Sequence, residues 1–133
     1  MKSHSVLDQS TKGVALVVDD SQLVKTVVAK SVESLGYAVY AFECCREALA
    51  WIGSYDGHLD LLVTDMTMPW MSGGELAVRV KQVFPDVRCL FMSGNNYETM
   101  LERGLLAPDD AFVSKPFSQA ELKRMILFAV GRV

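Results

Sequence analysis

The sequence predicts an α/β domain in which helices cover both faces of a parallel five-stranded sheet. Short apolar runs alternate with amphipathic segments along the chain, and most of these runs are continuous, as is typical of strands covered on both faces. Such alternation implies right-handed crossovers between parallel strands. A chain of 133 residues is long enough for one hydrophobic core and too short for a second.

Five apolar runs are the expected strands, and the polar residues before the first of them are the expected flexible tail. We assign 1–13 to this tail and 14–133 to the folded domain. The strands are Val14–Val18, Ala38–Ala41, Leu61–Thr64, Val87–Met92 and Ala111–Val113.

The segments between these runs carry helical signals. Ser72 with Glu75 and Ser118 with Glu121 have the spacing of capping boxes, each followed by apolar residues on one helix face. Apolar residues at helical spacing, such as Met100, predict packing in the core. The expected helices run from Ser21 to Gly36, over Glu43–Ile52, from Ser72 to Pro85, over Asn95–Arg103 and from Ser118 onward.

Composition excludes several classes of function. Half of the residues are hydrophobic and 22 % are charged, which is ordinary for a globular protein. The net charge is −3 with no cluster of Lys or Arg, so we expect no nucleic-acid partner. The apolar runs fall far short of the ~20 residues of a membrane span, and no secretory leader is visible. We therefore expect a cytoplasmic protein without a membrane partner, with reduced thiols at Cys44, Cys45 and Cys89.

Unusual polar residues follow four of the five expected strands. They are Asp19 and Asp20 after the first, Asp65 after the third, Ser93 at the end of the fourth and Lys115 after the fifth. Each of them alone is commoner as a turn or cap residue, but in an open α/β sheet the carboxyl ends of the strands form the ligand site. The set as a whole therefore predicts a functional site at this edge.

The chemistry of this set favours a phosphoryl group together with Mg²⁺. Two carboxylates about 4 Å apart repel by roughly 4 kcal/mol at an effective dielectric of 20. Mg²⁺ resolves such a conflict because it prefers carboxylate, water and phosphate oxygens. Lys115 would neutralise phosphoryl oxygens, and the Ser93 hydroxyl would donate a hydrogen bond to them.

Four segments that contain these residues resemble the receiver domains of two-component response regulators. They are Val17–Asp20, Leu62–Pro69, Phe91–Gly94 and Phe112–Phe117, and the resemblance extends from about Val14 to the C-terminus. It implies a flavodoxin-like (βα)5 fold with strand order 2-1-3-4-5. The sequences of residues 68–73 and of Phe91–Gly94 are also similar to those of receivers in hybrid sensor kinases.

The resemblance also implies roles for single residues. Asp65 would be the phosphoacceptor. Asp20 and Asp65 would ligate Mg²⁺ directly, with the backbone carbonyl of Thr67, and Asp19 would assist through water. Lys115 would contact the phosphoryl group.

Further implied roles concern switching and the backbone. Ser93 would move to bond the phosphoryl group, and Phe112 occupies the position of the family's aromatic switch residue, where Tyr is frequent. The bond before Pro116 would be cis. Gly73 matches a glycine that follows the phosphorylation loop, and Gly94 replaces the more usual alanine.

The function implied is that of a phosphorelay receiver whose catalysis is limited to its own phosphorylation and dephosphorylation. The chain's own His4 and His58 match no donor pattern. The phosphoryl donor would therefore be a partner, a sensor histidine kinase or a histidine phosphotransfer domain. An output protein, which the sequence does not identify, would read the phosphorylated surface.

Three alternatives remain open at this stage. An Asp-nucleophile phosphatase would resemble Asp-x-Asp, but Thr67 stands where its general acid is needed, and turnover of phosphate esters would reveal it. A flavodoxin-like binding module would need a phosphate loop after the first strand, and a yellow protein would indicate it. An interaction domain that is never phosphorylated would retain the fold without the chemistry.

Overall fold

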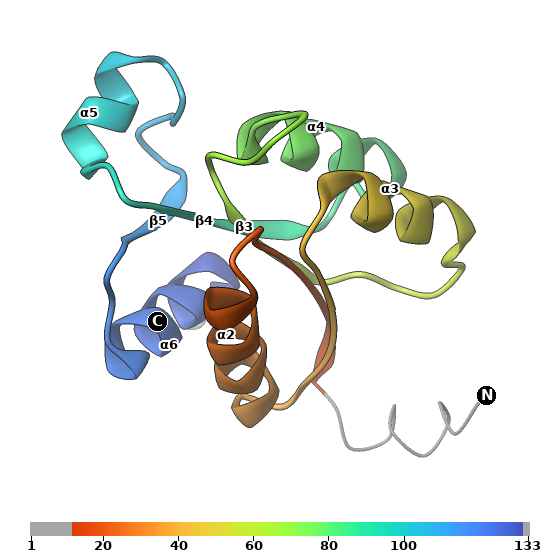
Figure 1. Cartoon of the computed structure of the whole chain (residues 1–133). Helices are drawn as coiled ribbons and strands as arrows, with labels where there is room; N and C mark the ends of the chain where they lie inside the picture. Colours follow the sequence, from red (N-terminus) through yellow and green to blue (C-terminus); the bar gives the residue numbers. More distant parts are fainter. Residues whose placement is uncertain (1–11, 132–133) are drawn as a thin grey trace.

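The computed structural model describes residues 12–131 and has the expected alternation of strands and helices (Figure 1). The expected tail falls mostly on residues 1–11, outside the described part. None of the described helices is long and apolar enough to cross a membrane. In chain order the elements are β1 (Gly13–Val18), α2 (Gln22–Ser34), β2 (Tyr37–Phe42), α3 (Cys45–Ser54), β3 (Leu61–Asp65), α4 (Gly73–Val83), β4 (Arg88–Ser93), α5 (Tyr97–Glu102), β5 (Ala111–Ser114) and α6 (Gln119–Ala129).

The five strands form one parallel sheet in the order β2-β1-β3-β4-β5. This confirms the order implied by the resemblance and the flavodoxin-like α/β class. Successive residues of a strand point to opposite faces, so Leu16 and Val17 of β1 belong to different core clusters. Helices α3 and α4 cover one face, and α2 and α6 cover the other (Figure 1).

Both predicted capping boxes are present. The Ser72 hydroxyl accepts from Glu75 N at 3.1 Å, and Ser72 N donates to Glu75 Oε1 at 3.0 Å. Ser118 and Glu121 make the same pair of bonds, each 3.0 Å long. These caps fix where α4 and α6 begin, after the loops that follow Asp65 and Lys115.

Helix α5 is the least embedded element of the described chain. It begins at Tyr97 with Asn96 as its cap, two residues later than expected, and it has six residues. Met100 is its only buried side chain, and this side chain belongs to the core cluster under α3 and α4. A further difference from expectation is Gly13, which we assigned to the tail and which is the first residue of β1.

Candidate functional site

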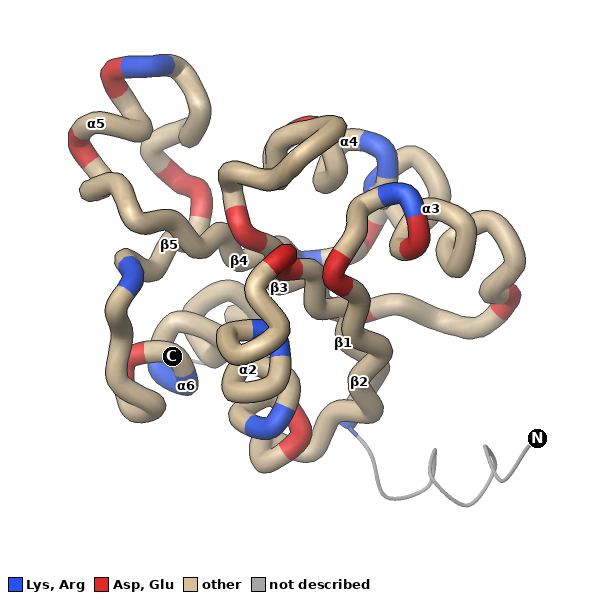
Figure 2. The backbone as a smooth tube through the Cα atoms, viewed as in Figure 1, with Lys and Arg blue, Asp and Glu red and all other residues tan. Residues whose placement is uncertain are grey.

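Three carboxylates lie together at the carboxyl edge of the sheet. Val18 of β1 pairs with Thr64 of β3, so the residues that follow them, Asp19 and Asp65, lie beside each other. One carboxylate oxygen from each of Asp19, Asp20 and Asp65 lies within 4.8 Å of the others. Figure 2 shows acidic segments gathered at this edge, near the label of β3. The predicted convergence of these three residues is therefore present.

Lys115 comes to the same place from β5. Its Nζ lies 2.9 Å from Asp19 Oδ2 and 3.2 Å from Asp65 Oδ1. Its backbone N donates to Ser93 O at 2.8 Å, and the bond to Pro116 is cis, as the resemblance implied. Three carboxylates and one ammonium group give the site a net charge of −2.

Burial distinguishes the carboxylates. Asp19 is fully buried, and its Oδ1 also accepts from Ser21 N at 2.9 Å. Asp65 is 6 % exposed, whereas Asp20 is exposed to solvent. Burial raises the pKa of the Asp65 carboxyl above its ordinary value, and the nearby Lys115 charge only partly opposes this. An uncompensated charge at this site is therefore costly.

Lys115 is held in its charged form by its partners. Burial lowers the pKa of the ammonium group, but the hydrogen bond to Asp19 and the charge of Asp65 outweigh it, so the pKa is raised overall. Asp19 therefore orients Lys115 beside Asp65 and stabilises the protonated form of this lysine.

The donor set fits a hard divalent cation. All the ligand atoms of the acidic cluster are carboxylate oxygens, which Mg²⁺ prefers, and a doubly charged ion would balance the net charge of −2. Asp20 is open to water, and water commonly completes the coordination of this ion. Thr67, whose carbonyl the resemblance adds to the ligands, is exposed two residues after Asp65.

The loop after Asp65 approaches the helix that follows it very closely. Gly73 N donates to Met66 O at 2.8 Å, and a Cβ on Gly73 would lie 2.3 Å from Asp65 O. A side chain here would therefore displace the backbone of Asp65. Within the same loop Trp70 has a φ of 79°, and the Arg46 guanidinium lies 4.3 Å from its ring centroid.

Ser93 and Phe112 lie on the neighbouring strands β4 and β5. The Ser93 hydroxyl is directed toward α5: it accepts from Asn95 N at 3.0 Å and donates to Met100 Sδ at 3.7 Å. Phe112 is 9 % exposed, with its ring centroid 5.8 Å from that of Tyr97. Sequence reasoning placed Met100 in the core from its helical spacing but gave no signal of its bond to Ser93.

Comparison with known proteins assigns this site to a family. The family model described as "Response regulator receiver domain" matches residues 15–127. The chain belongs to the response regulator receiver family. Its acidic cluster and Lys115 agree with a phosphoacceptor receiver.

Relatives of this receiver include long and short proteins. The sensor kinase CckA of Brucella abortus (strain 2308) is 32 % identical, over 91 % of the receiver and 13 % of its own length. The regulator NtrC of Azospirillum brasilense is 33 % identical, over 84 % of the receiver and 23 % of its own length. The two-component response regulator ORR5 of Oryza sativa subsp. japonica is 30 % identical, with 83 % of both chains covered.

Solved structures share the receiver's fold. A response regulator receiver protein from Sinorhizobium medicae WSM419 has a TM-score of 0.75 at 21 % identity, covering 90 % of this receiver and 96 % of that chain. The chemotaxis response regulator CheY4 of Vibrio cholerae has a TM-score of 0.73 at 26 % identity, covering 90 % and 99 %.

The receiver has an apolar groove directly beside the acidic site. It has a volume of about 380 Å³, and Leu23, Val24, Val27, Lys115, Pro116 and Phe117 line it. Leu23 is 75 % exposed. Lys115 therefore borders both the site and the groove.

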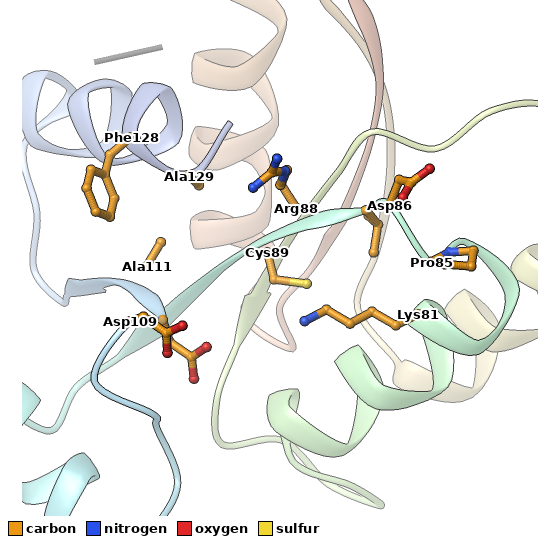
Figure 3. A pocket seen from close by; sticks show the side chains of 11 residues that line it. Lys81, Pro85, Asp86, Arg88, Cys89, Asp109, Ala111, Phe128 and Ala129 are labelled. Carbon is orange, nitrogen blue, oxygen red and sulfur yellow. The ribbon is translucent and has the colours of Figure 1, made fainter. Parts of the chain in front are cut away.

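A second hollow lies at the opposite edge of the sheet, at the amino ends of β4 and β5 (Figure 3). Its volume is about 610 Å³, and its lining includes Lys81, Arg88, Asp109 and the thiol of Cys89. It mixes charges of both signs and has no connection with the acidic cluster.

Proposed function

We propose that this receiver accepts one phosphoryl group on Asp65 from the phosphohistidine of a partner protein, with Mg²⁺ bound at Asp20 and Asp65. One observation supports this above the others. The Asp65 carboxylate lies 3.2 Å from Lys115 Nζ within a cluster of three carboxylates whose net charge, −2 with Lys115 included, suits a divalent ion. Such a site has both a nucleophile and a cation for the incoming phosphoryl oxygens.

The transfer forms an acyl phosphate. An Asp65 oxygen attacks the phosphorus, the bond from phosphorus to the histidine nitrogen breaks, and the imidazole leaves with the bonding electrons and takes up a proton. The Lys115 ammonium group, which pairs with the carboxylate before transfer, then stabilises the negative charge on the phosphoryl oxygens. Asp19 keeps this ammonium group aligned. Bound Mg²⁺ supplies additional positive charge for these oxygens. Attack by water later releases phosphate, so catalysis is confined to the receiver's own phosphorylation state.

The donor and the output are partner proteins in the cytoplasm. The relation to a protein named sensor kinase supports a histidine kinase, or a phosphotransfer domain supplied by one, as the donor. Phosphorylation adds roughly −2 charge and three acceptor oxygens near Ser93. The Ser93 hydroxyl then turns toward the phosphoryl group, Phe112 repacks, and the surface that the output protein reads changes.

Acetyl phosphate tests the acceptor without a partner. In the presence of Mg²⁺ we expect a mass increase of one phosphoryl group, lost on chelation and in Asp65→Asn, and retained in Asp109→Asn, which removes an exposed carboxylate at the opposite edge. Uptake that persists in Asp65→Asn would show that the acceptor is another residue. No uptake in the wild-type chain would favour the interaction domain that is never phosphorylated.

A further inference from the structure

We infer that Met100 is the positioning residue that couples Ser93 to helix α5. Its sulfur holds the Ser93 hydroxyl in the resting state, and this hydrogen bond breaks on phosphorylation. This inference rests on the proposed function. Two features of Met100 support it: its sulfur receives the Ser93 hydroxyl, and its side chain is the only buried one of α5. The contact that would change on phosphorylation is therefore also the anchor of the helix.

The resting contact is enclosed. Ser93 is 2 % exposed and Met100 is fully buried, so bulk water does not compete for the hydroxyl. The Ser93 Oγ atom accepts a hydrogen bond from Asn95 N at 3.0 Å, and its hydroxyl donates to Met100 Sδ at 3.7 Å. The resting orientation of Ser93 is therefore set by two groups, both on the side of α5.

The sulfur makes this orientation easy to leave. A thioether is a weak acceptor, so a Met100 sulfur that loses its hydrogen bond from Ser93 is not a costly unpaired group. A phosphoryl oxygen offers a charge-assisted bond, roughly twice as strong as a neutral one. The difference favours departure of the hydroxyl from Met100 once Asp65 is phosphorylated.

The consequence reaches the end of α5. The backbone carbonyl of Met100 accepts from Leu105 N at 2.9 Å, beyond the helix end, and the side chain packs in the same core cluster as Phe112. A shift of Met100 therefore moves the helix, its following turn and the surroundings of the Phe112 ring together.

Methionine methyl ¹³C spectra test the coupling in two stages. Without any phosphoryl analogue, Ser93→Ala should shift the Met100 methyl signal, whereas Ser114→Ala, the register partner of Ser93 on β5, should leave it unchanged. The Met125 methyl on α6 is the internal control and should not respond to either change. An unchanged Met100 signal in Ser93→Ala would overturn the resting contact.

The second stage adds Mg²⁺ and beryllofluoride, with adduct formation followed separately by ¹⁹F spectra. The Met100 methyl should move in the wild-type chain and by less than about a fifth as much in Ser93→Ala, although both form the adduct. In Met100→Leu the α5 amide signals should lie part-way toward their loaded positions before the analogue is added. An adduct without movement of Met100 overturns the coupling alone, whereas absence of an adduct overturns the proposed function.

Discussion

Asp19 and Asp20 are neighbours in the chain with different surroundings. Asp19 is fully buried and paired with Lys115, so its charge is already used inside the protein. Asp20 is exposed and has no hydrogen bond or ion pair among the described contacts, so it is free to offer its oxygens to a hydrated ion. The two carboxylates should therefore differ in what their removal does.

We predict that Asp20→Asn weakens Mg²⁺ binding about tenfold, a change of about 1.4 kcal/mol, because one anionic ligand becomes neutral. Isothermal calorimetry at constant ionic strength measures this affinity. Asp56→Asn removes an exposed carboxylate from a distant loop and should leave the affinity unchanged. Equal affinities in Asp20→Asn and wild type would exclude Asp20 as a ligand.

Cys89 provides a prediction that depends on pH. Burial raises the pKa of its thiol from 9.0 to about 11, since the charged thiolate is disfavoured away from water. At pH 8 the thiolate fraction falls to about one in a thousand, compared with about one in ten for an ordinary thiol of this kind. Alkylation of Cys89 by iodoacetamide should therefore be roughly a hundredfold slower in the folded protein than in urea.

Mass spectrometry of the modified peptide follows this reaction. The rate at folded Cys89 should rise about tenfold per pH unit from 8 to 10, because the thiolate fraction rises with pH below the pKa. Equal rates in the folded and unfolded chain would contradict the burial of this thiol.

At the level of elements, the start of α4 constrains the loop that follows Asp65. A methyl group on Gly73 would meet the Asp65 carbonyl at 2.3 Å, whereas one on Gly74 would have 3.7 Å to its nearest neighbour, the Ser72 hydroxyl. A side chain should therefore be tolerated at Gly74 and not at the adjacent Gly73.

We predict that Gly73→Ala lowers the free energy of unfolding by about 2 kcal/mol, since backbone must move to relieve the overlap. Gly74→Ala should be neutral or stabilising by up to about 0.5 kcal/mol, because alanine restricts the unfolded chain and favours the helix. Urea unfolding of both variants measures the difference. If Gly73→Ala were as stable as Gly74→Ala, the close approach would be wrong.

Local signals in the sequence predicted the helices and strands, but they did not predict which side chains of the site contact each other. Ser72 and Ser118 were predicted as caps because a capping box is complete within four residues. The bond from Ser93 to Met100 depends on the rotamers of two buried side chains, and the bridge from Lys115 to Asp19 joins residues 96 apart in the chain. No periodicity carries such information, so the site's residues were predictable while their pairings were not.

At the level of the whole molecule, the acidic site and the apolar groove share one wall. Lys115 belongs to both, so a protein that reaches Asp65 with a histidine also approaches Leu23 and Val27. Burying a side chain such as Leu23, which is 75 % exposed, contributes about 1.5–3 kcal/mol to an interface. We therefore predict that this groove is a contact surface for the proposed phosphohistidine donor.

We predict that Leu23→Ser lowers kcat/KM for transfer from a phosphorylated histidine phosphotransfer protein about tenfold, a loss of about 1.4 kcal/mol of contact. Labelling by acetyl phosphate should be unchanged, because this donor makes no contact with the groove. Val83→Ser changes another exposed apolar residue, on α4, and serves as the control. An equal loss with both donors would indicate damage to the site rather than to a docking surface.

The left-handed backbone of Trp70 has a consequence for how this chain can vary. Glycine adopts a φ of 79° freely, whereas another residue there costs about 1–2 kcal/mol. The tryptophan codon UGG becomes the glycine codon GGG by one base change. That change would also remove the ring over which Arg46 lies, a contact worth about 0.5–1 kcal/mol at an exposed site. A random library selected only for heat resistance would thus reach a more relaxed loop in one step, and would do so by discarding an indole that is 73 % exposed in the loop after Asp65.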